Sequence, residues 1–196
     1  MISVENIIND RGVTITMGFS SSQGPLRPVD LHNLSMTQKM LMITDGTLTE
    51  LLEAYWNEKI HIAKLSEEVI HDARNIQLLD VKQGENVLER KILLQGTVSK
   101  RNWLYAESLI MPGRLETQFR EDLIESRIPI GKLWKKYRTE TFKEMINYFR
   151  EPADCLADYF AEINAEDTLL CRTYRIFTNG KPVMKITEKF PENYYI

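Results

Sequence analysis

The strongest structural signal in the sequence lies near its C-terminus, where two apolar segments flank the tripeptide Thr178-Asn179-Gly180. Asn-Gly in this setting favours a type I′ turn, because both central residues of that turn have positive φ and these two residue types tolerate it. The sequence therefore predicts an antiparallel β-hairpin with strands at Leu169–Phe177 and Lys181–Phe190. Any fold of this chain has to accommodate that hairpin.

The second strand of this hairpin carries a carboxylate on its apolar face. Successive side chains of a strand point to opposite faces. The alternation gives one face with Met184, Ile186, Glu188 and Phe190 and another with Val183, Lys185, Thr187 and Lys189. We expect the lysine-bearing face to meet solvent. Burying the carboxylate of Glu188 is unfavourable unless a partner binds it or it carries a proton, so Glu188 is the first candidate functional residue.

A predicted strand over Val87–Leu94 shows the same conflict with the opposite charge. Leu88, Ile92 and Leu94 share a face with Arg90. Two interpretations stay open. Arg90 and Glu188 form a buried ion pair, or they enclose a cavity in which the guanidinium holds a ligand carboxylate and the glutamate meets a hydroxyl or a proton.

The remaining patterns predict a chain in which strands and short helices are mixed. Further strands are predicted at Lys59–Val69 and Trp103–Ile110, with a short one at Val13–Met17. Helices are predicted on both sides of Asp45-Gly46 between residues 30 and 57, and over residues 115–127, 132–138, 139–149 and 153–163. Thr47 and Glu50 fit a capping box at the start of the second helix. Such short helices suit either a lid over a cavity or plain packing on one face of a sheet.

Composition narrows the class of protein. A formal charge of −3 without a long basic stripe argues against nucleic acid as a partner. We recognise no signal peptide and no apolar run that would span a bilayer, so we expect no membrane association and a cytoplasmic location. His32, His61 and His71 lack the spacing of metal ligands, and no metal is expected. The length fits one domain, residues 1–196, in which residues 1–30 form an N-terminal arm that either drapes over the domain or supports a homo-oligomer.

Four stretches, in the same order along the chain, resemble the chorismate pyruvate-lyase family, whose enzymes convert chorismate into 4-hydroxybenzoate and pyruvate. They are Asp45–Glu53, Leu88–Leu94, Ile128–Lys132 and Asn179–Phe190. The resemblance runs from about residue 35 to the end of the chain. It implies an α+β fold of the chorismate lyase-like type, in which helices act as flaps that cover an internal ligand cavity on a single antiparallel β-sheet.

The resemblance also implies which residues meet the ligand. They are Leu48, Arg90, Ile130 and Glu188. Arg90 and Glu188 are the catalytic candidates: Arg90 would hold the ring carboxylate, and Glu188 would accept the ring hydroxyl or act as a general base. Leu48 and Ile130 would line the pocket, partly through backbone groups. The implied reaction is an elimination that needs no cofactor, and its small-molecule partner is an aromatic or cyclohexadiene carboxylate.

Two other functions compete with this one. UTRA domains, which bind small effectors in some transcription regulators, resemble the same fold, so the chain is alternatively a sensor or carrier of an aromatic acid without turnover. In a purely structural protein, Arg90 and Glu188 would be no more than an ion pair. Release of pyruvate from chorismate separates the enzyme from both alternatives.

Overall fold

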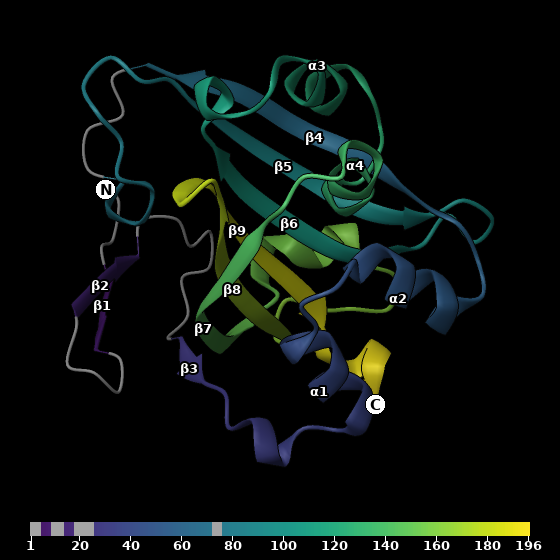
Figure 1. Ribbon diagram of the computed structural model, residues 1–196. Coiled ribbons are helices and arrows are strands. Elements are labelled where there is room, and N and C mark those ends of the chain that lie inside the picture. The colour runs from purple at the N-terminus through teal and green to yellow at the C-terminus, as the bar shows by residue number, and fades with distance from the viewer. Residues whose placement is uncertain (1–4, 9–13, 18–25, 72–75) are drawn as a thin grey trace.

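A computed structural model describes residues 5–8, 14–17, 26–71 and 76–196 of the chain (Figure 1). Its central feature is a seven-stranded antiparallel sheet with the order β3-β7-β8-β9-β6-β5-β4. These strands are β3 (Arg27–Pro28), β4 (Ile60–Ile70), β5 (Val87–Gly96), β6 (Asn102–Ile110), β7 (Phe142–Pro152), β8 (Thr168–Thr178) and β9 (Lys181–Pro191). A separate two-stranded ladder joins β1 (Glu5–Ile8) and β2 (Thr14–Met17). Most of the arm predicted over residues 1–30 lies outside the described residues.

Four α-helices and several short 3₁₀ helices connect the strands. The α-helices are α1 (Met36–Ile43), α2 (Leu48–Trp56), α3 (Thr117–Glu125) and α4 (Ile130–Tyr137). The 3₁₀ helices are η1 (Leu31–Asn33), η2 (Gln77–Leu79), η3 (Pro112–Arg114), η4 (Asp154–Tyr159) and η5 (Glu192–Tyr195). In Figure 1, α3 and α4 lie beside β4 and β5, whereas α1 lies near the C-terminus. The predicted combination of one antiparallel sheet with helices is confirmed.

The C-terminal hairpin forms as predicted. Asn179 and Gly180 have φ angles of 49° and 71°, the positive values that a type I′ turn requires. Strands β8 and β9 pair from Thr178 opposite Lys181 to Leu169 opposite Pro191, with one register shift next to Phe177. Because β8 and β9 are central strands of the sheet, residues on this hairpin reach the middle of the molecule.

The helix prediction over residues 139–149 is wrong, because residues 142–149 belong to β7. Its apolar residues fit a helical stripe, yet β7 pairs along its whole length with β8 and has one register shift between Met145 and Asn147. The outer edge of β8 offers backbone hydrogen-bond partners to this segment, and such tertiary pairing overrides local helix propensity. The helix predicted over residues 153–163 shrinks to the 3₁₀ helix η4.

Both faces of the sheet are covered, which the sequence pattern did not predict. On the face opposite the α-helices, Leu156 and Phe160 from the η4 segment join Tyr105 and Phe149 in one apolar cluster. The expectation that Lys189 meets solvent is therefore wrong, since its side chain is 1% exposed. Its ammonium lies 2.7 Å from Glu151 and 3.4 Å from Glu107, so the charge is paired.

Candidate functional site

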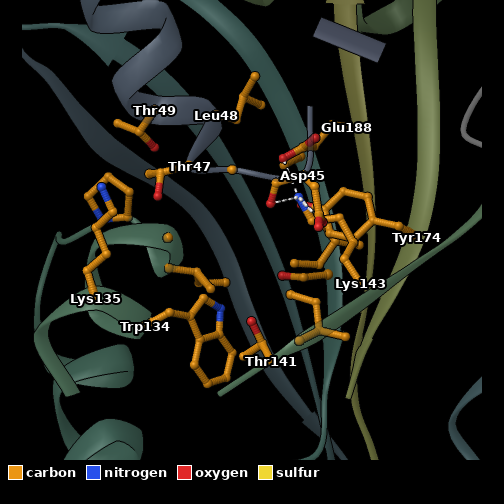
Figure 2. A pocket seen from close by; sticks show the side chains of 18 of the residues that line it. Asp45, Thr47, Leu48, Thr49, Trp134, Lys135, Thr141, Lys143, Tyr174 and Glu188 are labelled. Carbon is orange, nitrogen blue, oxygen red and sulfur yellow. Dashed lines mark hydrogen bonds and ion pairs between the residues drawn. The ribbon is translucent and has the colours of Figure 1, made fainter. Parts of the chain in front are cut away.

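A cavity of about 410 Å³ lies between the helices and the sheet (Figure 2). Its volume falls in the range of small-molecule sites. The loop 45–47 and the start of α2 form one wall, and the start of α4 with the segment that follows it forms another. Strands β5, β6, β7, β8 and β9 supply a third wall through Ile92, Leu94, Leu104, Ala106, Ser108, Lys143, Tyr174, Ile176, Ile186 and Glu188.

Leu48 and Ile130 line this cavity, and each is the first residue of a helix, α2 and α4 respectively. The first amide groups of a helix lack intrahelical acceptors, so both helix starts can offer N–H donors to a bound molecule. The two starts pack closely, because a Cβ at Gly131 would lie 2.8 Å from Cγ2 of Thr47. Only a residue without a side chain fits there without a shift of Thr47.

Thr47 does not form the predicted capping box. It precedes α2 without any side-chain hydrogen bond to the helix, and its side chain lines the cavity instead. A capping box is present instead at α1, where Ser35 and Gln38 exchange hydrogen bonds with each other's backbone. The hydroxyl of Thr47 is therefore available to a ligand.

Glu188 lies in the cavity wall and is 7% exposed. Two neighbours on β8 donate hydrogen bonds to it: Arg172 Nε to Oε2 at 2.6 Å and the Tyr174 hydroxyl to Oε1 at 2.9 Å. Burial and the charge of Glu188 raise the pKa of Tyr174 well above its ordinary value, so the phenol stays protonated and keeps donating. Glu188 is thus held as an acceptor whose orientation is fixed from two sides.

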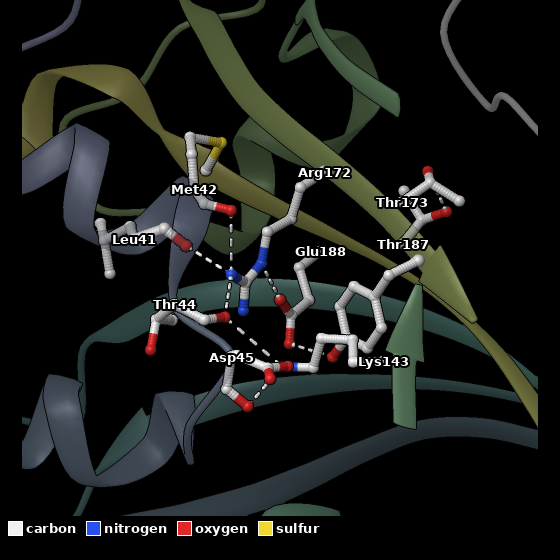
Figure 3. Close-up of polar contacts among 10 residues, drawn as sticks. Leu41, Met42, Thr44, Asp45, Lys143, Arg172, Thr173, Thr187 and Glu188 are labelled. Atoms are coloured by element: carbon white, nitrogen blue, oxygen red, sulfur yellow. Dashed lines mark hydrogen bonds and ion pairs between the residues drawn. The ribbon is translucent and has the colours of Figure 1, made fainter. Parts of the chain in front are cut away.

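Arg172 connects this carboxylate to the polypeptide that leads into the cavity rim (Figure 3). Its side chain is fully buried, and Nη1 donates to the carbonyl oxygens of Leu41, Met42 and Thr44 at 2.6, 3.2 and 3.1 Å. These carbonyls end α1 and open the loop before α2. One guanidinium therefore positions both Glu188 and the rim.

Lys143 is the cation that β7 contributes to the cavity. Its ammonium lies 4.8 Å from the centre of the Tyr174 ring and donates to the carbonyls of Thr44 and Asp45 at 3.4 and 3.2 Å. Burial, followed by the charge of Arg172, lowers the pKa of Lys143. The nearest carboxylate that pairs with it, Asp45, lies 3.9 Å away on a side chain that is 81% exposed.

Arg90 is buried next to the cavity but is not among the residues that line it. It projects from the same face of β5 as Ile92 and pairs across the strands with Ser108, and both of these residues do line the cavity. The three guanidinium nitrogens of Arg90 have no hydrogen-bond acceptor among the described residues. Their ion-pair partner is Glu67, whose Oε2 lies 3.5 Å from Nε.

The structure corrects the ion pair considered from the sequence. Glu188 pairs with Arg172 and Arg90 pairs with Glu67, and each pair joins residues that lie directly opposite on neighbouring strands. Sequence reasoning missed Arg172, Tyr174 and Lys143. Alternation along Leu169–Phe177 places Arg172 and Tyr174 on one face and would have identified them, whereas the helix prediction for β7 hid Lys143.

Comparison with known proteins gives a family and a fold. The family model "Chorismate pyruvate-lyase Rv2949c-like" matches residues 42–195. A chorismate pyruvate-lyase of Mycobacterium leprae is 32% identical over 162 residues, which cover 82% of this chain and 77% of that protein. None of the helices in the described ranges has the length and apolar character needed to cross a membrane.

Solved structures match the fold at low sequence identity. The effector domain of PhnF from Mycobacterium smegmatis has a TM-score of 0.57 and 11% identity, and the match covers 85% of this chain and 93% of that domain. A GntR-family transcriptional regulator from Enterococcus faecalis has a TM-score of 0.51 and 11% identity, with 69% of this chain and 95% of that one covered. The chain therefore shares its fold with the effector domain of PhnF and with this GntR-family regulator.

Proposed function

The chain belongs to the Rv2949c-like chorismate pyruvate-lyase family, and from this premise we propose that it converts chorismate into 4-hydroxybenzoate and pyruvate. The observation that carries the proposal is the buried carboxylate of Glu188 in the wall of a cavity of about 410 Å³. A carboxylate held in place by Arg172, with lone pairs left over, is suited to accept a hydrogen bond from the hydroxyl of a ring bound in that cavity.

The reaction is balanced without a co-reactant. The C3–oxygen bond of chorismate breaks, C4 loses its proton, and the ring becomes aromatic. The departing enolpyruvate takes up a proton as it becomes pyruvate, which balances the proton that C4 releases. Because aromatisation supplies much of the driving force, the protein mainly has to orient the substrate and exclude water.

Each site residue has a separate task in this proposal. Glu188 accepts a hydrogen bond from the ring hydroxyl and fixes the ring in the cavity. Arg90 does not line the cavity itself, but it pairs across the strands with the lining residue Ser108, and its buried guanidinium has no hydrogen-bond acceptor among the described residues. In this proposal it anchors the ring carboxylate from that side. Leu48 and Ile130 enclose the ring and offer the free amides of two helix starts.

The test incubates the purified chain with chorismate and follows pyruvate and 4-hydroxybenzoate together. We expect equal amounts of both products from the wild-type chain. Glu188→Gln should lower kcat/KM by about a hundredfold, a loss typical of a removed charge-assisted contact in the transition state. Glu192→Gln is the matched control, since Glu192 also forms an ion pair, with Arg150, but does not line the cavity. Absence of pyruvate from the wild-type reaction would reject the proposal.

The second candidate is a domain that binds an aromatic acid without turnover. The observation in its favour is the shared architecture with the effector domain of PhnF. Under this alternative, 4-hydroxybenzoate binds with a measurable heat and chorismate is recovered intact.

A further inference from the structure

We propose that Lys143 forms a second carboxylate-binding subsite in the cavity, which takes the carboxylate of the enolpyruvyl group while Arg90 takes the ring carboxylate. This inference rests on the proposed function and specifies how a dicarboxylate is distinguished from a monocarboxylate. Chorismate carries two carboxylates, and only one of them remains on the aromatic product.

The contacts of Lys143 leave its charge available. The side chain is 14% exposed, and its two hydrogen bonds go to neutral carbonyls at 3.2 and 3.4 Å, near the long limit for such bonds. The carboxylate of Asp45, at 3.9 Å and largely in solvent, neutralises it weakly, and Glu188, which also attracts it, is already bound by Arg172 and Tyr174. A partly buried ammonium in this state gains from a ligand carboxylate that enters the cavity.

The other cations around the cavity are engaged or exposed. Arg172 does not line the cavity, and its Nε and Nη1 donate to Glu188 and to three carbonyl oxygens. Lys135 is 60% exposed and pairs with Glu50. Arg138 lines the cavity but is exposed to solvent. Among the described residues, Lys143 is the lining cation that combines burial with weak neutralisation.

The positions of the three side chains in the sheet are compatible with the positions of the groups on the substrate. Glu188 lies on β9, Arg90 lies two strands away on β5, and Lys143 lies two strands away on β7 in the other direction. On chorismate, the enolpyruvyl ether is on C3, next to the hydroxyl on C4, whereas the ring carboxylate is on C1 at the opposite end of the ring. A ring whose hydroxyl meets Glu188 therefore keeps the enolpyruvyl carboxylate near Glu188 and directs the ring carboxylate away from it. Figure 2 shows Lys143 next to Tyr174 and Glu188 at one end of the cavity.

The experiment compares two stable ligands by calorimetry. One is 4-hydroxybenzoate, and the other is 3-(carboxymethoxy)-4-hydroxybenzoate, which has the same ring groups and a second carboxylate in place of the enolpyruvyl group. We expect the wild-type chain to prefer the dicarboxylate. Lys143→Met should weaken binding of the dicarboxylate about tenfold to a hundredfold. It should change the affinity for 4-hydroxybenzoate by no more than about threefold. Lys143→Arg should keep most of the preference.

The control variant is Lys136→Met, which removes the same charge from α4 outside the cavity and should leave the preference unchanged. An equal loss for both ligands in Lys143→Met, or no loss for either, overturns the subsite. The outcome for the proposed function is separate. If the wild-type chain releases no pyruvate, but prefers the dicarboxylate and the Lys143→Met variant does not, the subsite stands and the lyase proposal falls. If pyruvate is released and Lys143→Met keeps both the preference and kcat/KM, the lyase stands and the subsite falls.

Discussion

Nε of Arg172 lies 2.6 Å from Oε2 of Glu188, and the two side chains face each other across β8 and β9 with the arginine out of contact with solvent. A buried pair of this kind adds little net stability, since both charges lose hydration, but it fixes geometry. Here the same guanidinium also binds three carbonyls at the end of α1. The position of the acceptor in the cavity wall is thereby coupled to the rim of the cavity.

Breaking this pair from one side should be far more costly than replacing it. We expect Arg172→Met to lower the free energy of unfolding by about 3–5 kcal/mol, because the charge of Glu188 stays buried without its partner. The double variant Arg172→Met with Glu188→Leu should recover a large part of that loss. Urea unfolding of the wild-type, single and double variants measures it. A double variant whose loss equals the sum of the single losses would show that the two residues act independently.

We expect Arg90 to lower the stability of the folded protein while it strengthens ligand binding. Its guanidinium is 1% exposed and lacks hydrogen-bond acceptors among the described residues, and its ion-pair partner Glu67 keeps a second cation, Lys64 at 3.4 Å, when Arg90 is removed. We expect Arg90→Met to raise the free energy of unfolding by about 1–2 kcal/mol and to weaken 4-hydroxybenzoate by at least about tenfold. Arg114→Met is the control with the opposite sign, because Arg114 donates to Glu85 and to three backbone carbonyls. Destabilisation by both substitutions would contradict this role of Arg90.

The close packing of the two helix starts gives a prediction about cavity shape. Gly131→Ala places a Cβ against Cγ2 of Thr47 and should separate α2 from α4, at a cost of about 1–3 kcal/mol and with weaker 4-hydroxybenzoate binding. Thr47→Ser removes the methyl group that collides. We therefore expect the double variant Thr47→Ser with Gly131→Ala to regain affinity in calorimetric titrations. Failure of the serine to restore any affinity would place the effect of Gly131 elsewhere.

Glu85 should contribute stability that disappears in acid. Hydrogen bonds from Arg114, at 2.6 and 3.0 Å, lower the pKa of Glu85 from 4.5 to about 2. A carboxyl whose pKa is depressed by folding stabilises the protein above the unfolded pKa, and this contribution is lost as the pH falls from about 4.5 to about 2. At pH 7, Glu85→Gln should cost about 1 kcal/mol, since the pair is partly exposed and screened. Urea unfolding at pH 7 and pH 3 should show the difference between wild type and variant shrinking in acid.

Binding of the dicarboxylate should weaken at alkaline pH. Burial and Arg172 lower the pKa of Lys143, and Glu188 and Asp45 only partly oppose them. The cationic form that attracts a carboxylate is therefore lost at a lower pH than for an ordinary lysine. The Tyr174 phenol, which faces Lys143, has its pKa raised well above its usual range and stays neutral. Titrations between pH 7 and pH 10 should show the preference for the dicarboxylate falling in the wild type. The preference should persist in Lys143→Arg, because a guanidinium keeps its proton.

Local chemistry in the sequence determined much of the fold. The Asn179-Gly180 turn required a hairpin, alternation identified β4, β5 and β6, and the break at Asp45-Gly46 separated α1 from α2. The same local patterns placed Leu48 and Ile130 next to helix starts and placed Glu188 on the apolar face of its strand. Each of these features depends on residues close together along the chain, so each was accessible without tertiary structure.

The partners of the site residues depended on tertiary structure. An uninterrupted hairpin that starts from Thr178 opposite Lys181 would place Cys171 opposite Glu188. The register shift next to Phe177 moves Arg172 into that position instead. A shift of one residue brings the alternate face of a strand into register with its partner, so this irregularity decides which side chain meets the carboxylate. It lies where Pro182 has no amide hydrogen for the ladder and where the carbonyl of Val183 accepts the amide of Met111 from the end of β6. The sequence by itself thus supplied the carboxylate and the hairpin, whereas packing against the neighbouring strand chose the arginine that holds it.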